Sequence, residues 1–247
     1  MKKNLQDYEL INKSIFFKKQ GILAFGDLHL GYEQMLKEHG FSFPFNQLED
    51  TINDIKRIIE KIKSLKFRVK KIIILGDFKH YFGFEKEEKF RVGDLLAFLE
   101  KCVDKKNIIL IKGNHERVKI LPKEYKYRNY YINKNIIFVH GDKIYKELFD
   151  KKIKTIVIGH LHPAISLTDK SGVKKEKYKC FLTGKWKSKN VVILPSFLNL
   201  VEGTIINGDY ERNNEGFCMI PKQILKDFDV SILGKEKIYD FGKLKDS

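Results

Sequence analysis

The sequence predicts an α/β fold, and two features of the residue pattern lead to that prediction. Short apolar runs rich in β-branched residues recur along the 247-residue chain. Segments with apolar residues at helical spacing separate the first three of these runs. Strands that alternate with helices imply right-handed crossovers, so the central part of the sheet is expected to be largely parallel.

The predicted strands all end abruptly in Gly, Asp, Asn or His. They are GILAFGDLH at 21–29, KIIILGDFKH at 71–80, NIILIKGNHE at 107–116, NIIFVHGD at 135–142 and TIVIGHLH at 155–162. Because each run is apolar throughout rather than alternating, each is expected to be a strand buried on both faces.

Two helices are predicted between the first three strands. The first covers residues 46–65, with Asn46 as its N-cap, and the second covers residues 86–102 and is weakened by Gly93. The apolar residues at helical spacing in the first helix are Leu48, Ile52, Ile55, Ile59 and Ile62.

The remaining strands are joined by shorter connections, so part of the structure is expected to be antiparallel. A hairpin is predicted around Gln20 and Gly21, and a second strand pair is predicted within residues 179–197. No linker rich in Pro, Gly or Ser divides the chain, so residues 1–220 are expected to form one domain. Residues 221–247 are expected to be a tail, either a packed appendage or a flexible arm.

The composition indicates the cellular compartment in which such a protein is expected. No apolar run approaches the roughly 20 residues that span a bilayer, and the N-terminus has no continuous apolar segment typical of a signal peptide. The three cysteines are scattered and form no CxxC pair, which argues against a disulfide framework or a zinc ribbon. We therefore expect a cytoplasmic protein that does not contact a membrane.

The chain is strongly basic, with 48 Lys and Arg residues against 32 Asp and Glu residues and a formal net charge of +16. A charge of this sign favours a polyanionic partner such as nucleic acid. A lysine- and isoleucine-rich composition can also reflect a thermophile or an AT-rich genome. The basic residues cluster at 66–71, 123–128 and 174–189. The aromatic residues among the last two clusters could stack on bases or could simply belong to strand faces.

Metal-binding residue types collect where the predicted strands end. Ligands of open α/β sheets bind beyond the carboxyl ends of the strands. Six of the seven histidines lie at these positions, and only His39 does not. The residues at the strand ends are Asp27, His29, Asp77, His80, Asn114, His115, His140, His160 and His162.

This donor set contains oxygen and nitrogen but no thiolate, which suits divalent ions such as Mn, Fe or Zn. The donors are too many for one ion, whereas two ions that share one carboxylate would use them well. Two metals about 3.5–4 Å apart are an established arrangement for the hydrolysis of phosphate esters. In extended backbone His160 and His162 would project to the same side, as ligands of one centre must.

Five motifs stand in a fixed order between residues 27 and 162: D-x-H, G-D-x-x-H, G-N-H-E, a lone His before G-D, and G-H-x-H. Together they resemble the calcineurin-like metallophosphoesterase superfamily. The resemblance implies a four-layer sandwich of two mixed β-sheets flanked by helices. The stretches DLHLGYE, GDFKH and the later GKWK…ILPSF most resemble archaeal phosphoesterases related to the SbcD and Mre11 nucleases. They also resemble bacterial phosphoesterases associated with DNA ligase and helicase genes.

The resemblance also assigns roles to residues of this sequence. It implies that Asp77 bridges two metal ions, with Mn expected and Fe, Zn or Ni as alternatives. The implied ligands are Asp27, His29 and His162 for the first ion and Asn114, His140 and His160 for the second. Three further residues would be catalytic: His115 and His80 would contact the scissile phosphate or the leaving oxygen, and Glu116 would orient His115.

The expected function is that of a two-metal phosphodiesterase in which hydroxide attacks a phosphodiester of nucleic acid, as in nucleases of DNA repair. A helicase, ligase or ATPase would then be a suitable protein partner. One alternative is a phosphodiesterase for small or cyclic nucleotides. Another, from a different class, is a non-catalytic binding scaffold with the same fold. The sequence leaves open the natural substrate, the polarity of cleavage and the oligomeric state.

Overall fold

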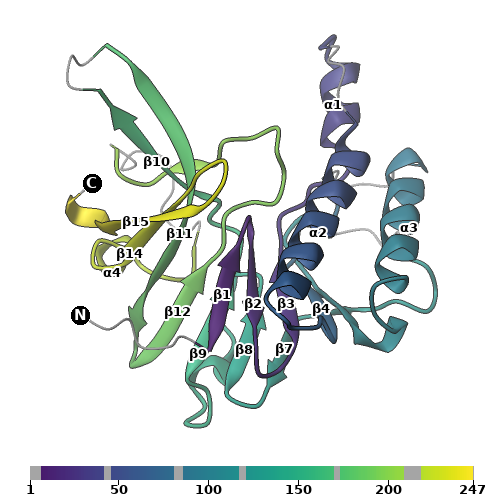
Figure 1. Cartoon of the computed structure of the whole chain (residues 1–247), viewed down its shortest axis with the longest axis horizontal. Coiled ribbons are helices and arrows are strands. Elements are labelled where there is room, and N and C mark those ends of the chain that lie inside the picture. Colours follow the sequence, from purple (N-terminus) through teal and green to yellow (C-terminus); the bar gives the residue numbers. More distant parts are fainter. Residues whose placement is uncertain are drawn as a thin grey trace.

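Two mixed β-sheets pack against each other in the computed structural model of the chain (Figure 1). The structure describes residues 7–41, 46–80, 86–116, 121–169, 173–208 and 218–246. Apolar side chains from both sheets meet in one fully buried cluster, which includes Ile73, Phe138, Val157 and Phe181. Since the strands of this interface are apolar on both faces, the face of each sheet that points away from the other sheet can pack against helices or loops.

The first sheet has the strand order β1-β2-β3-β4-β5-β6. Strand β2 is antiparallel to both β1 and β3, and β3 to β6 are parallel. The strands are β1 (Tyr8–Ile11), β2 (Ser14–Phe17), β3 (Ile22–Phe25), β4 (Lys71–Ile74), β5 (Ile108–Ile111) and β6 (Tyr127–Arg128).

The second sheet has the order β13-β10-β11-β12-β9-β8-β7, with β14 and β15 attached through β11. Its central strands β8, β9 and β12 are parallel, and most of the other pairs are antiparallel. The strands are β7 (Tyr130–Asn133), β8 (Ile136–Val139), β9 (Thr155–Ile158), β10 (Pro163–Thr168), β11 (Lys175–Trp186), β12 (Lys189–Ile193), β13 (Thr204–Ile205), β14 (Asp229–Leu233) and β15 (Ile238–Lys243).

Helices cover the outer face of the first sheet. The predicted helices are present as α2 (Gln47–Ser64) and α3 (Lys86–Glu100), and the side chain of Asn46 caps α2 by accepting a hydrogen bond from the Glu49 amide at 3.2 Å. Apolar residues of both helices join the core cluster of this sheet. The other helical segments are α1 (Tyr32–Glu38), α4 (Lys222–Leu225), η1 (Lys105–Asn107), η2 (Lys146–Phe149) and η4 (Leu244–Asp246).

Residues 218–246 add to the second sheet. Strand β14 pairs with β11 from Cys180 opposite Ile232 to Thr183 opposite Asp229, and Leu225 and Phe228 are buried in the core of that sheet. The prediction of an α/β fold with two mixed sheets flanked by helices is confirmed. Among the described residues, none of the helices combines the length and the apolar character needed to cross a membrane.

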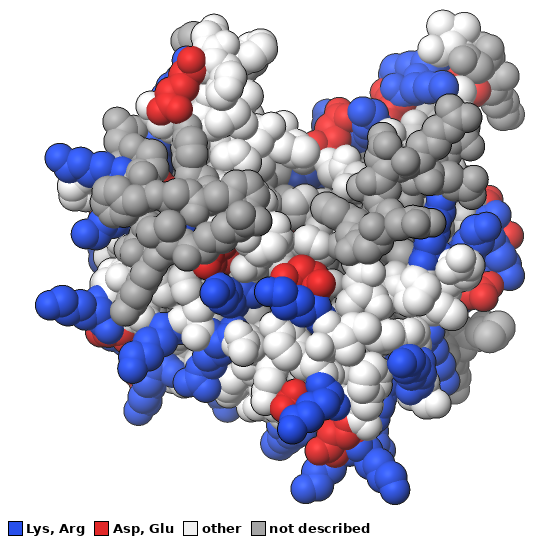
Figure 2. All heavy atoms as spheres, turned by 180° about the vertical axis from the view of Figure 1, so that it is seen from behind, with Lys and Arg blue, Asp and Glu red and all other residues white. Residues whose placement is uncertain are grey.

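The packing brings the carboxyl ends of five strands together at one end of the molecule. Backbone hydrogen bonds tie the loops that follow β3 and β4, where the Asp27 amide donates to Gly76 O at 3.0 Å. The loops after β8 and β9 are tied in the same way, by the Gly159 amide and His140 O at 2.9 Å. From the same end, α1 and the β10–β11 hairpin project outward, and the surface between them is hollowed (Figure 1, Figure 2).

Candidate metal centre

Two buried carboxylates form the middle of the candidate site. Asp27 follows β3 and is fully buried, and Asp77 follows β4 and is 2% exposed. Asp77 Oδ2 lies 3.7 Å from His29 Nε2 and 3.5 Å from His140 Nε2, so it stands between histidines from two loops. Asp27 Oδ1 lies 3.2 Å from His162 Nε2. The predicted convergence of these loops is therefore present in the structure.

The carboxylates belong to two overlapping groups of side chains whose ligand atoms are close enough to hold an ion each, and a third group, His29, His80 and His115, contains no carboxylate. The first group is Asp27, His29, Asp77 and His162, and the second is Asp77, His140 and His160. Asn114 Oδ1 lies 3.0 Å from His140 Nε2, which places this amide beside the second group. Asp77 is the member that the two groups share.

Hydrogen bonds fix the orientation of these side chains from behind. His140 Nδ1 donates to the Leu75 carbonyl at 2.7 Å, so its Nε2 carries the lone pair that faces Asp77. The backbone amide of His160 donates to Asp27 Oδ2 at 3.0 Å, and that of His115 donates to Asp77 Oδ1 at 3.1 Å. Contacts of this kind hold metal-ligating groups in place and fix the tautomer of a histidine.

The glycines of the motifs are needed because the carboxylates occupy their side-chain positions. A Cβ atom on Gly113 would collide with the Asp77 carboxylate, and one on Gly159 would collide with the Asp27 carboxylate. A Cβ atom on Gly76 would lie 2.5 Å from His140 Nδ1, and this glycine also has φ of 91°. The motif glycines therefore leave room for the carboxylates and for the His140 ring.

The electrostatics of the site fit a divalent cation. Within the described residues, the ion pairs of Asp27 and Asp77 are made with imidazoles and not with Lys or Arg. Burial is the main cause that lowers the pKa of His29 well below its ordinary value and that of His160 to about 4. These imidazoles are therefore neutral at pH 7, which is the form that binds metal. Burial acts to lower the pKa of His140, but the Asp77 and Asp27 carboxylates raise it above its ordinary value, so the two buried carboxylates favour a positive charge beside them.

His80 and His115 form a separate part of the site beside His29. The His29 and His115 rings have centroids 4.8 Å apart, and the rings of His80 and His115 are stacked at 5.5 Å. His115 Nδ1 donates to the His80 carbonyl at 2.5 Å, so its Nε2 faces the centre, 4.0 Å from Asp77 Oδ2. The Tyr32 ring meets His80 at a centroid distance of 4.8 Å and marks the outer edge of this part.

The contacts of Glu116 differ from the role predicted for it, which was to orient the His115 imidazole. Its carboxylate accepts hydrogen bonds from the backbone amides of Gly113 at 2.6 Å, Phe78 at 2.7 Å and Asp77 at 3.1 Å. Burial, together with the Asp77 charge, raises the pKa of Glu116 to about 7. Glu116 thus joins the loops after β4 and β5 through their backbone amides, and its catalytic role stays a prediction.

The sequence reasoning missed a buried ion pair next to His80. Glu88 of α3 accepts a hydrogen bond from the His80 amide at 2.7 Å and lies 3.6 Å from the Lys79 ammonium. Both charged side chains are fully buried. A lysine inside a strand-end motif does not by itself predict a buried ion pair, since most lysines are exposed.

Two of the basic sequence stretches lie away from the site. Residues 66–71 lead into β4 and residues 185–189 form the β11–β12 turn, so both lie near the opposite end of the strands. Figure 2 shows many Lys and Arg side chains at that end. Residues 123–128 end in β6, where Tyr127 and Arg128 pair with Leu110 and Ile111 at the carboxyl end of β5. Tyr125 and Trp186 are each 5% exposed, so these aromatic rings belong to the core and do not form a stacking surface. Residues 174–179 belong to the β10–β11 hairpin, and Lys179 lies at its base opposite Ala164, which is two residues along the chain from His162.

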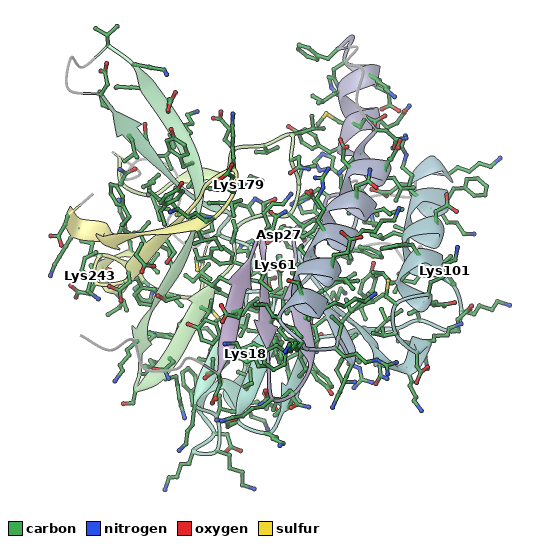
Figure 3. The ribbon with its side chains drawn as sticks, viewed as in Figure 1. Lys18, Asp27, Lys61, Lys101, Lys179 and Lys243 are labelled. Atoms are coloured by element: carbon green, nitrogen blue, oxygen red, sulfur yellow. The ribbon has the colours of Figure 1, made fainter. Side chains whose placement is uncertain are left out.

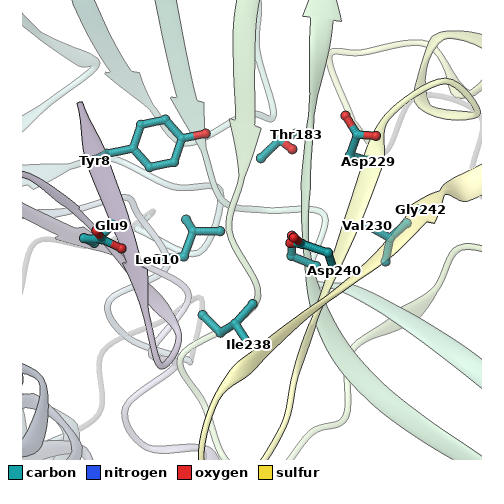
Figure 4. A pocket seen from close by; sticks show the side chains of 10 residues that line it. Tyr8, Glu9, Leu10, Thr183, Asp229, Val230, Ile238, Asp240 and Gly242 are labelled. Atoms are coloured by element: carbon teal, nitrogen blue, oxygen red, sulfur yellow. The ribbon is translucent and has the colours of Figure 1, made fainter. Parts of the chain in front are cut away.

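A cavity of about 540 Å³ lies elsewhere, between β1 and the β14–β15 pair (Figure 4). Tyr8, Glu9, Thr183, Asp229 and Asp240 line it together with apolar residues. None of the predicted metal ligands reaches this cavity. Its carboxylates are already engaged, since Glu9 pairs with Lys18 and Asp229 pairs with Lys243.

Comparison with known proteins agrees with this geometry. Residues 21–185 match the family described as calcineurin-like phosphoesterase, and the chain belongs to that family. Among solved structures, it is similar to nuclease MPE of Pseudomonas putida, with a TM-score of 0.59 and 16% identity over 95% of this chain and 100% of that one. It is also similar to wild-type Vps29 complexed with zinc from Entamoeba histolytica, with a TM-score of 0.40 and 12% identity over 89% of this chain and 96% of that one. No curated protein sequence matches the chain.

The collision at Gly159 gives a direct test of the site geometry. We expect Gly159→Ala to displace the Asp27 carboxylate and to weaken metal binding by about 10- to 100-fold, the usual effect of disturbing a ligand's support. Titration of the metal-free protein with Mn²⁺ in a calorimeter measures this. Gly93→Ala is the matched control, because its Cβ would enter open space in α3 and should stabilise the fold by about 0.5–1 kcal/mol. Wild-type affinity in Gly159→Ala would contradict the geometry.

Proposed function

We propose that this protein is a two-metal phosphodiesterase that cleaves nucleic acid by hydroxide attack on a phosphodiester. The observation that carries the proposal is the position of Asp77, which belongs to both of the ligand groups that contain a carboxylate. Asp27, His29 and His162 would hold one ion with Asp77. Asn114, His140 and His160 would hold the other with Asp77. This arrangement gives His160 and His162 different ions.

Two bound ions would lower the pKa of a water molecule and neutralise charge on the phosphoryl oxygens. The oxygen- and nitrogen-only donor set favours Mn, with Fe, Zn or Ni as alternatives. The residues of the chain would hold the two ions in position. The carboxylates would set the spacing of the ions, and the hydrogen bonds behind the carboxylates would keep that spacing constant.

His115 and His80 are suited to contact the substrate. Burial, followed by the nearby His115, lowers the pKa of His80 to about 4, so at neutral pH its ring is uncharged and able to donate a hydrogen bond. His115 presents Nε2 toward the centre while its Nδ1 proton is held by the His80 carbonyl. We infer that these rings contact the phosphate or the leaving oxygen and orient it.

The choice of nucleic acid as substrate is supported by three features. The formal net charge is +16, the β10–β11 hairpin that follows His162 carries lysines, and a similar fold is found in a protein named as a nuclease. We propose a relationship to the SbcD and Mre11 type or to the ligase-associated phosphoesterases, with a helicase, ligase or ATPase as partner. A non-catalytic scaffold would not need the full set of donors that the structure brings together.

Asp77→Ala tests the shared carboxylate. Because Asp77 belongs to both groups, the variant should lose both ions and at least about 100-fold in activity, as expected when a preorganised charge is removed. Metal content by mass spectrometry and turnover of a model diester measure the two effects. Wild-type metal content with wild-type turnover would rule out the bridging assignment.

His80→Ala separates catalysis from metal binding. We expect this variant to keep both ions and to lose about 100-fold in kcat, since a hydrogen-bonding contact to the phosphate or the leaving oxygen has been removed. If the metal stoichiometry falls instead, His80 is a ligand, which its proximity to His29 and His115 would allow.

The substrate is tested with end-labelled single- and double-stranded DNA, purified protein and Mn²⁺, with Asp77→Ala as the inactive control. Shortened or laddered products that the control does not give would establish a nuclease and its polarity. Intact DNA together with hydrolysis of a small model diester would overturn the nucleic-acid assignment in favour of a small phosphodiester.

A further inference from the structure

We propose that segment 196–199, which follows β12, is a positioning loop for Asp27 and that two lysines, the buried Lys13 and the half-buried Lys179, hold it in place. This inference rests on the proposed role of Asp27 as a metal ligand. The two lysines would act on metal binding through the loop and the backbone of Asp27, without touching the ions themselves. This positioning role gives a function to the end of the ILPSF stretch, whose residues are not among the proposed metal ligands.

Segment 196–199 holds the backbone of Asp27 through three hydrogen bonds. Ser196 Oγ donates to the Asp27 carbonyl at 3.0 Å, and the Leu198 amide donates to the same carbonyl at 3.2 Å. The Phe197 amide donates to the Gly26 carbonyl at 3.0 Å. Asp27 has a left-handed backbone with φ of 56°, so its conformation needs such external support.

Lys179 fixes the segment from the side of β11. Its ammonium donates to the Ser196 carbonyl at 2.9 Å and also to the Leu198 carbonyl. These two carbonyls belong to the residues whose hydroxyl and amide hold Asp27, so Lys179 closes a short chain of contacts to the metal site. Figure 3 shows Lys179 and Asp27 in the central part of the molecule. Within the described residues, no carboxylate pairs with this ammonium.

Lys13 fixes the same segment from the other side. It lies in the turn between β1 and β2, is 2% exposed, and donates to Asn199 Oδ1 at 2.5 Å and to Asp54 Oδ2 at 2.6 Å. The ammonium also lies 4.6 Å from the centroid of the Phe197 ring. Asn199 Nδ2 donates to Asp54 Oδ2 at 3.1 Å, so α2 is joined to the segment as well.

The number of buried charges supports a positioning role. Removing an ammonium from water has a large energetic cost, which only well-formed hydrogen bonds can offset. Here two ammonium groups, one from the β1–β2 turn and one from β11, converge on four consecutive residues, and three of those residues donate hydrogen bonds to Asp27 or Gly26. An apolar side chain at position 13 or 179 would fill the same space without directing the carbonyls and the Asn199 amide. The contacts therefore fix the position of the segment more than they add to its stability.

The test is Lys179→Met, which keeps the length of the side chain and removes its donors. Metal-free wild type and variant are titrated with Mn²⁺, and the free ion is followed by electron paramagnetic resonance. We expect wild type to bind two ions and the variant to bind one of them about 10- to 100-fold more weakly, the usual effect of losing a support of a ligand. Two ions with wild-type affinity in the variant would overturn the inference.

Lys189→Met is the matched control. Lys189 also donates to two backbone carbonyls, those of Asp150 at 2.7 Å and Ile153 at 2.6 Å, but its contacts are near the opposite end of the strands. It should reduce thermal stability to a similar degree and leave both Mn²⁺ affinities unchanged. If the two variants weaken Mn²⁺ binding equally, Lys179 supports only the general stability of the fold, and the inference fails.

Ser196→Ala provides a second variant in case Lys179→Met does not fold. It removes one donor to the Asp27 carbonyl, and we expect weaker binding of one ion by several-fold with the other unchanged; unchanged binding of both would overturn the inference. These titrations use Mn²⁺ without substrate. A wild-type protein that binds no Mn²⁺ would therefore refute Mn as the metal of the proposed centre, a result distinct from failure of the positioning role or of the nucleic-acid assignment.

Discussion

The burial of Asp27 and Asp77 is the constraint on which the rest of the structure depends. Two carboxylates without a Lys or Arg partner among the described residues are costly to remove from water. The fold meets this cost with backbone amides, which donate to both carboxylates from the loops after β9 and β5. The imidazoles that surround them complete a set of groups with an affinity for cations. The loops are thus joined to one another through the same carboxylates that form the site.

A second constraint is the shape of the loops. Five of the predicted ligands have a left-handed backbone, and all five follow β3, β4 or β9: Asp27, His29, Asp77, His160 and His162. This conformation costs on the order of 1–2 kcal/mol for a residue with a side chain. The surrounding contacts must therefore determine it, and they include Glu116, the motif glycines and segment 196–199. Strain of this kind collects at functional sites because the rigid core can support it.

The sequence predicted those parts of the molecule that follow from local pattern. The five strands, both long helices and the Asn46 cap are present because periodicity and capping act over a few residues. The convergence of Asp27, Asp77 and the histidines followed from the rule that loops at the carboxyl ends of strands form the site. The contacts of Glu116, the Lys79–Glu88 pair and the Lys13 and Lys179 network could not be predicted, because each depends on which distant segment packs beside it. The aromatic residues among the lysines were open between two interpretations, and Tyr125 and Trp186 proved to be core residues.

The distribution of charge places a physical limit on how the protein could use its lysines. A strand of four residues spans about 13 Å, so the basic cluster that precedes β4 lies more than a Debye length of about 8 Å from the site. At physiological ionic strength such charges are largely screened from a single phosphate at the metal centre. They can act only on a polyanion long enough to reach around the molecule. A small nucleotide would be bound by the site alone, whereas a long nucleic acid would also release counterions from the distant lysines. Dependence of affinity on substrate length and salt is therefore the physical property that separates these two substrates, because both meet the same ligands at the centre.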